Sequence, residues 1–219
     1  MKLIIINGSP RGTKSNSKVI SDWIRSSMGD DIMVFEFFVK NQNTHELAIK
    51  SIDSNTTILM VFPLYTDAMP AILKLFIEKL EMVKSNIKNA NVYFIVQSGF
   101  QGANHSRYVE KYLAYFASYF SLRHMGTAIK PSGEGLRSMP KFLTKKTAKS
   151  FTTLGQNIID GKQFDEKILK KLAQFEKPNM FFKFIINKTK ISNYYMDSML
   201  KKNGVYDNRL DKPYLTKDQ

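Results

Sequence analysis

Apolar residues in the first 130 positions gather into short runs that polar residues hardly interrupt. These runs occupy residues 2–6, 32–39, 56–63 and 91–97, and a weaker one covers 125–130. They are rich in β-branched and aromatic residues and do not alternate with polar ones. This pattern predicts strands that are buried on both faces of a sheet.

Between the runs, apolar residues recur at helical spacing with polar residues between them. After Ser15, the side chains of Val19, Ile20, Trp23 and Ile24 share one face of a predicted helix. Further helices are predicted over residues 44–51, 70–80, 105–120 and 140–159. Pro70 suits the first turn of its helix, because its missing N–H has no partner there in any case.

Strands that alternate with helices predict a parallel α/β sheet, because parallel neighbours need crossover connections that place helices on both faces. Five such strands indicate a doubly wound sheet of the flavodoxin type. Ligands of these folds bind beyond the carboxyl ends of the strands. The loops that start at Asn7, Pro63 and Ser98 are therefore the expected ligand loops.

The charge is unevenly distributed over the 219 residues. Residues 1–110 carry 12 Lys and Arg against 10 Asp and Glu, whereas residues 111–219 carry 21 against 9, so most of the net charge of +14 lies in the second half. We expect residues 1–160 to form the α/β domain. Residues 161–219 are expected to form a basic, aromatic C-terminal extension, a helix and arm without the character of an independent domain.

Composition excludes several kinds of chemistry. The chain has no cysteine, which excludes disulfides, thiolate catalysis and iron–sulfur clusters. Its histidines, His45, His105 and His124, show no metal-ligand spacing, so no metal site is predicted and each is expected to be structural. Only four apolar residues lie between Lys2 and Asn7, and no run is long enough to span a membrane, so a cytoplasmic protein is expected.

The stretch "INGSPRGTKSNS", residues 6–17, lies between the first strand and the first helix. Backbone N–H groups and the helix dipole favour an anion at this position. The glycine spacing matches neither the Walker loop nor the dinucleotide fingerprint. Its hydroxyl and amide side chains instead favour a monophosphate, with Ser15 or Asn16 as the helix N-cap. A capped turn without a ligand is the alternative.

Three stretches together resemble the flavodoxin-like NAD(P)H-dependent FMN reductases. "NGSPRGTKSNS" resembles the phosphate loop of this family, and "FPLYTDAMP" at 62–70 resembles its second, flavin-wrapping segment. "QSGF" at 97–100 lies where the family has a third flavin-contacting loop. The resemblance covers about residues 1–160.

The resemblance implies a set of FMN-binding residues. Those expected at the phosphate are Ser9, Arg11, Ser15, Asn16 and Ser17. Those expected along the isoalloxazine ring are Pro63, Leu64, Tyr65, Thr66, Asp67, Met69, Ser98, Gly99 and Phe100. Hydride transfer between a nicotinamide and a flavin requires no acid–base pair from the protein, so no catalytic side chain is predicted.

Two functions fit this pattern. The first is an FMN-dependent NAD(P)H oxidoreductase that passes a hydride through FMN to a quinone, a nitro or azo compound, or a flavin. The second is a flavodoxin-like electron carrier or a non-catalytic flavin-binding protein. We favour the enzyme, because a basic surface attracts NAD(P)H and other anionic substrates.

The basic tail leaves its role open. It contains Phe181, Phe184, Ile185, Lys188, Ile191, Tyr195 and Met199 at mixed helical intervals. A dimerisation arm or a helix packed on the core is expected, and the family resemblance favours a homodimer. Contact with a membrane surface ranks below these, and no nucleic-acid partner is expected because no base-reading motif is present.

Overall fold

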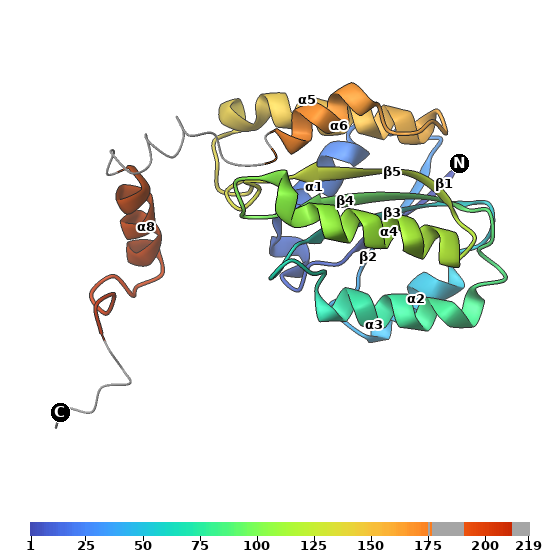
Figure 1. Ribbon diagram of the computed structural model, residues 1–219, viewed down its shortest axis with the longest axis horizontal. Coiled ribbons are helices and arrows are strands. Elements are labelled where there is room, and N and C mark those ends of the chain that lie inside the picture. The colour runs from blue at the N-terminus through green and yellow to red at the C-terminus, as the bar shows by residue number, and fades with distance from the viewer. Residues whose placement is uncertain (175, 177–190, 212–219) are drawn as a thin grey trace. The chain divides into compact units, whose positions relative to one another are not determined.

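The computed structural model describes residues 1–174, 176 and 191–211. Its sheet has five parallel strands in the order β2-β1-β3-β4-β5, which is a doubly wound, flavodoxin-like arrangement (Figure 1). The predicted fold class is confirmed. The strands are β1 (Lys2–Asn7), β2 (Met33–Phe38), β3 (Thr56–Pro63), β4 (Asn91–Gln97) and β5 (Arg123–Lys130).

Helices cover both faces of this sheet, with α1, α5 and α6 above it and α2 and α3 below it in Figure 1. The helices of the sheet unit are α1 (Asn16–Arg25), α2 (Asn43–Lys50), α3 (Ala71–Leu80), α4 (Arg107–Tyr119), α5 (Lys141–Ile159) and α6 (Glu166–Ala173). Short 3-10 turns precede α1 and α4, at Gly12–Lys14 and Ala103–Ser106.

Each central strand contributes to two separate cores, because successive side chains point to opposite faces. Ile4 and Ile6 of β1 pack with α2, α3 and α4, whereas Leu3 and Ile5 pack with α1 and α5. All four side chains are fully buried. Burial on both faces explains why these strands appear in the sequence as uninterrupted apolar runs.

Residues beyond α5 still pack on the sheet, and one compact unit spans Met1–Lys177. The Phe164 ring lies 4.8 Å from the Tyr93 ring, and its backbone N–H donates to Met125 O at 2.9 Å. Gly126 makes this approach possible, because a Cβ there would lie 2.9 Å from Phe164 Cβ. This compact unit therefore includes residues that follow α5 in the chain.

A second compact unit spans Pro178–Gln219 and contains α8 (Ile191–Lys202). The helix ends at Lys202, and Gly204 in the turn after it has a φ of 69° and donates to Lys201 O at 3.1 Å. Of the tail positions noted at helical intervals, Phe181, Phe184, Ile185 and Lys188 lie outside the described residues.

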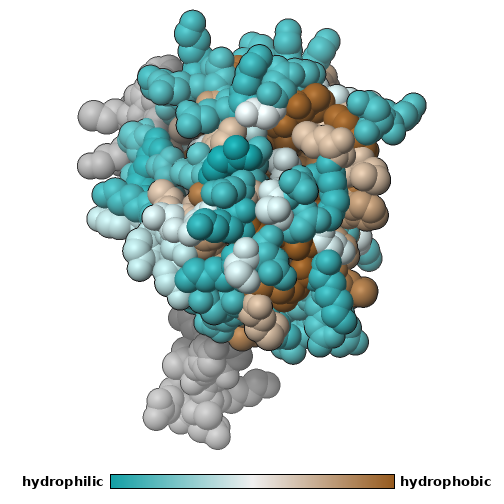
Figure 2. All heavy atoms as spheres, turned by 90° about the vertical axis from the view of Figure 1, so that its right-hand side faces the viewer, coloured by the Kyte–Doolittle hydropathy of each residue, from teal (hydrophilic) through white to brown (hydrophobic). Residues whose placement is uncertain are grey.

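The surface of the molecule is mixed in character. Figure 2 shows one face, on which hydrophilic residues predominate and apolar residues gather toward the right-hand side. None of the helices in the described part of the chain combines the length and the apolar character that crossing a membrane requires.

Candidate functional site

The loops that follow β1, β3, β4 and β5 enclose a hollow of about 460 Å³ at the carboxyl edge of the sheet. Parallel strands bring their carboxyl ends to one edge, so segments far apart in the sequence meet there. This volume is in the range of small-molecule sites. The lining residues are Ser9, Arg11, Ser15, Asn16, Pro63, Leu64, Tyr65, Thr66, Gln97, Ser98, Gly99, Phe100 and Glu134.

The loop after β1 is held by its own side chains. Asn7 Oδ1 accepts from Ser9 N at 3.2 Å, Ser9 Oγ accepts from Arg11 N at 3.3 Å, and Ser9 O accepts from Gly12 N at 3.0 Å. Gly12 has a φ of 55°, and a Cβ there would lie 2.8 Å from Lys40 Cε. The left-handed backbone at this position therefore favours glycine.

Ser15 is the N-cap of α1, one of the two predicted alternatives. Its Oγ accepts from Lys18 N at 3.1 Å and donates to Gly12 O at 2.6 Å. The N–H groups of Asn16 and Ser17 lie in the first turn, where a helix offers them no acceptor. The start of α1 therefore presents free donors and the positive end of the helix dipole.

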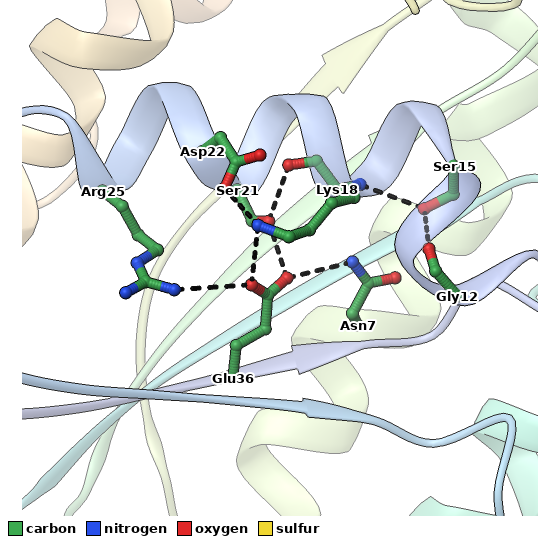
Figure 3. A network of polar contacts seen from close by, with 8 residues as sticks. All are labelled: Asn7, Gly12, Ser15, Lys18, Ser21, Asp22, Arg25 and Glu36. Atoms are coloured by element: carbon green, nitrogen blue, oxygen red, sulfur yellow. Dashed lines mark hydrogen bonds and ion pairs between the residues drawn. The ribbon is translucent and has the colours of Figure 1, made fainter.

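A buried carboxylate supports this loop from below, as Figure 3 shows. The side chain of Glu36 on β2 is 4% exposed and lies 3.3 Å from Lys18 Nζ. It accepts from Asn7 Nδ2 at 3.2 Å and from Ser21 Oγ at 2.7 Å. Because Asn7 also holds Ser9, a chain of hydrogen bonds runs from β2 to the loop.

Lys18 carries the positive charge of this network. Burial lowers the pKa of its ammonium group, but hydrogen bonds to Asp22 and Glu36 and their charges outweigh this, so its pKa lies above the ordinary value. Lys18 thus stays protonated and compensates the buried carboxylate of Glu36.

The loop after β3 makes a tight turn at the mouth of the hollow. Tyr65 and Ala68 exchange two backbone hydrogen bonds, of 2.8 and 3.0 Å. Thr66 and Asp67 between them have φ values of 48° and 61°, as a type I′ turn requires. A residue with a side chain is sterically disfavoured at a positive φ, so the backbone beside the hollow is strained.

The loop after β4 forms the opposite side. The Phe100 ring stacks on the His105 ring with centroids 4.1 Å apart, and His105 Nδ1 lies 3.0 Å from Asp67 Oδ1. The loops after β3 and β4 are therefore joined at the mouth. Ser98 Oγ is buried and has no hydrogen-bond partner within the part of the chain that the structure describes.

Most of the predicted site residues line this hollow, and three do not. Ser17 is buried in the first turn of α1, with an Oγ that has no partner among the described residues. Asp67 points to His105. Met69 packs partly against the core and borders a separate hollow beside Pro10 and Lys40.

Two lining residues escape prediction from the sequence, Gln97 and Glu134. Gln97 is the last residue of β4, and a polar residue at a strand end was a usable signal. Glu134 follows β5, whose loop also opens at the carboxyl edge. Asn16 Nδ2 donates to Glu134 O at 2.7 Å and so joins the first and last of these loops.

The histidines have structural partners. His45 is buried, with Nε2 2.8 Å from Val39 O. His124 Nε2 lies 3.0 Å from Thr127 Oγ1, and burial lowers the pKa of its imidazole. Within residues 1–174, 176 and 191–211, no group of three His, Asp or Glu side chains is placed to hold a metal ion.

Fold and geometry together define the chain as an α/β protein of the flavodoxin-like fold with a hollow at the carboxyl edge of its sheet. No protein-family model matches the sequence, and no curated protein matches it.

Solved structures do share the fold. An FMN-dependent NADH-azoreductase from Bacillus anthracis in complex with FMN is 14% identical, covers 72% of this chain and 98% of its own, and gives a TM-score of 0.56. An NADPH-quinone reductase from P. pentosaceus is 13% identical, with coverages of 72% and 99% and a TM-score of 0.53. General stress protein 14 from Treponema denticola in complex with FMN is 17% identical, with coverages of 72% and 98% and a TM-score of 0.52. The resemblance to flavodoxin-like reductases is thereby confirmed at the level of the fold.

Proposed function

We propose that this chain is an FMN-dependent NAD(P)H oxidoreductase that reduces a quinone, a nitro or azo compound, or a flavin. One observation carries the proposal. A single hollow joins the hydroxyl-rich start of α1 to the apolar and aromatic side chains of Pro63, Leu64 and Phe100. An anion site beside a flat apolar site matches a phosphorylated, ring-bearing cofactor such as FMN.

The phosphate end fits this cofactor. Asn16 and Ser17 offer free N–H groups at the positive end of the α1 dipole. Arg11 lines the hollow beside them and is exposed, so its guanidinium can approach a phosphate.

The ring end fits as well. Tyr65 and Phe100 line the hollow and are 47% and 37% exposed, so two aromatic side chains can flank a flat ring. In the described part of the chain, the N–H groups of Gly99 and Phe100 donate to no backbone carbonyl. Together with Ser98 Oγ they supply donors for the polar edge of a flavin, where negative charge develops on reduction.

Bound FMN would supply the hydride chemistry, accepting from a nicotinamide and donating to the acceptor. The side chains that line the hollow would bind the cofactor and orient its ring. The network around Glu36 fixes the loop at the phosphate, and the Phe100–His105–Asp67 contact fixes the wall at the ring. The net charge of +14 favours the approach of anionic NAD(P)H. We extend the proposal to a homodimer as the working form.

The test is NAD(P)H oxidation by the purified chain with a benzoquinone acceptor, measured against FMN concentration. Turnover should saturate with FMN. Arg11→Ala should weaken FMN binding by about 1.5–3 kcal/mol, the range for a hydrogen bond to a charged group.

Lys14→Ala is the matched control, because Lys14 is an exposed cation of the same loop that does not line the hollow. It should change FMN affinity much less than Arg11→Ala. If the two substitutions weaken FMN binding equally, Arg11 contributes only its positive charge and makes no specific contact with the phosphate. Turnover that does not depend on FMN would contradict the proposed function.

A further inference from the structure

The loop before α5 and the first half of this helix carry a cluster of cations that have no ion-pair partner in the described part of the chain. Arg137, Lys141, Lys145, Lys146 and Lys149 are all exposed, and residues 135–159 contain no Asp or Glu. None of the five forms an ion pair with another described residue. This contrasts with α6, where Lys170 pairs with Glu166 at 3.6 Å. The positive charge here is therefore available to an external partner.

Large apolar side chains are exposed within the same segment. Phe142 is 75% exposed, Leu143 is 60% and Met139 is 44%. Single exposed apolar residues are ordinary, but three within five positions, surrounded by cations, mark an interaction surface. We call residues 137–149 the α5 patch.

The geometry of α5 directs the side chains of the α5 patch away from the sheet and toward solvent. Phe142, Lys145, Lys146 and Lys149 recur at helical spacing on one face of α5. The opposite face is buried through Phe151, Leu154 and Ile158. Phe151 also stacks on Trp23 of α1 with ring centroids 6.0 Å apart, which fixes α5 to the body of the sheet unit.

The α5 patch also adjoins the candidate site. Arg137 N donates to Asn16 Oδ1 at 2.9 Å, and Asn16 lines the hollow at the carboxyl edge. A second hollow, of about 510 Å³, lies between α1 and α5 and is lined by Trp23, Leu136, Arg137 and Phe142 among others. The patch and the site therefore open on the same edge of the sheet.

We propose that the α5 patch binds the surface of an anionic lipid bilayer, with Phe142 and Leu143 inserted among the headgroups and the five cations against lipid phosphates. Apolar side chains flanked by lysines are the pattern of interfacial binding, in which neither charge nor apolar area alone is sufficient. A nucleic acid would use the cations but leaves Leu143 and Met139 unexplained. The inference goes beyond the proposed function and does not need bound flavin.

Sedimentation of the full chain with vesicles tests the proposal. Binding to phosphatidylglycerol mixed with phosphatidylcholine is expected, with none to phosphatidylcholine alone. Lys145→Glu/Lys146→Glu should lower the partition coefficient at least about tenfold, because each cation near an anionic surface adds severalfold. Lys170→Glu/Lys171→Glu on α6 changes the net charge equally at exposed positions and should bind nearly as the unaltered chain does.

A labelled cysteine locates the contact, because the chain has no cysteine of its own. An environment-sensitive dye on Phe142→Cys should shift to the blue with anionic vesicles. The same dye on Met82→Cys, a position that is 73% exposed after α3, should not shift. The proposal is overturned if both charge-reversed variants bind equally, if the dye at 142 does not respond, or if oligonucleotides bind through this patch while vesicles do not.

Discussion

Glu36 is a buried carboxylate whose partners reach from β1 and α1. Replacing it with glutamine keeps the acceptor oxygen for Asn7 and Ser21 but removes the charge that Lys18 compensates. We expect Glu36→Gln to lower the free energy of unfolding by about 1–2 kcal/mol, because a charged hydrogen-bond acceptor is lost in a buried site. Urea denaturation measures this change.

Glu78→Gln is the matched control for that substitution. Glu78 is exposed and faces Lys74 at 4.0 Å, so its loss should change stability by no more than about 0.5 kcal/mol. Equal effects at the two positions would show that the network around Glu36 contributes nothing special to the fold.

Lys130 ends β5 with its ammonium group buried, donating to Pro131 O at 2.5 Å. Burial lowers the pKa of this group to about 8 from 10.5. Between these values the unfolded chain binds more protons than the folded one, so stability should rise with pH. The expected gain between about pH 8 and 10 is roughly 2 kcal/mol.

Lys130→Met isolates this effect, because it removes the titrating group and keeps an unbranched side chain. The free energy of unfolding of Lys130→Met should not show the increase between about pH 8 and 10. Burial also raises the pKa of Tyr93 from 10 to about 12, which lowers stability as the pH rises above about 10; both chains keep Tyr93, so this contribution cancels in their comparison. Parallel pH profiles for the two chains would contradict the prediction.

At the scale of single residues, the sequence pattern points to Ser9 and Ser15 of the first loop, which line the hollow, and does not point to Glu134 of the last loop, which lines it too. Ser9 and Ser15 stand out because they follow a strand and open a helix. Glu134 stands in a loop whose strand, β5, has a weak apolar run broken by Gly126. The structure explains why a glycine interrupts this strand: Phe164 packs directly against Gly126 and leaves no room for a side chain there.

At the scale of elements, the turn over Tyr65–Ala68 stores strain. Thr66 is β-branched and has a positive φ, which costs about 1–2 kcal/mol relative to an ordinary backbone conformation. Asn and Gly are the residues that type I′ turns prefer. Thr66→Asn/Asp67→Gly should therefore raise the free energy of unfolding by about 1 kcal/mol, because the relieved strain exceeds the loss of the exposed contact between Asp67 and His105; thermal and urea denaturation measure the change.

Asp30→Asn/Asp31→Gly is the control for the turn, because neither residue there has a positive φ. The same residue types should not stabilise the chain at those positions. If both double variants lower stability, the turn at 65–68 is not strained in the way described.

The elements themselves follow closely from the sequence where a strand is buried on both faces. Residues 56–63 and 91–97 are predicted as strands and form β3 and β4 with those bounds. The sequence also contains a capping residue and a helical apolar pattern that indicate α6. These residues belong to the predicted C-terminal extension, in which no separate helix is predicted at this position. Asp165 caps this helix by accepting from Lys167 N at 2.7 Å, and Ile168, Leu169 and Leu172 follow at helical spacing.

At the scale of the whole molecule, topology brings the site together. Loops that begin at residues 7, 63, 97 and 130 meet because parallel strands end at one edge. Strand and helix patterns predict this convergence, whereas the stacking of Phe100 on His105 depends on side-chain packing that no local pattern contains. The fold can therefore be predicted from the sequence more completely than the side-chain contacts that line the site.

The most direct test of the central claim is the absorption spectrum of the chain purified with FMN and freed of unbound flavin. It should be recorded without oxygen before and after adding NADPH and then NADH. We predict that a bound flavin spectrum is present and is bleached by at least one of the two nucleotides. A chain that retains no flavin would contradict the assignment of the hollow, and retained flavin that neither nucleotide bleaches would contradict the enzyme and favour an electron carrier.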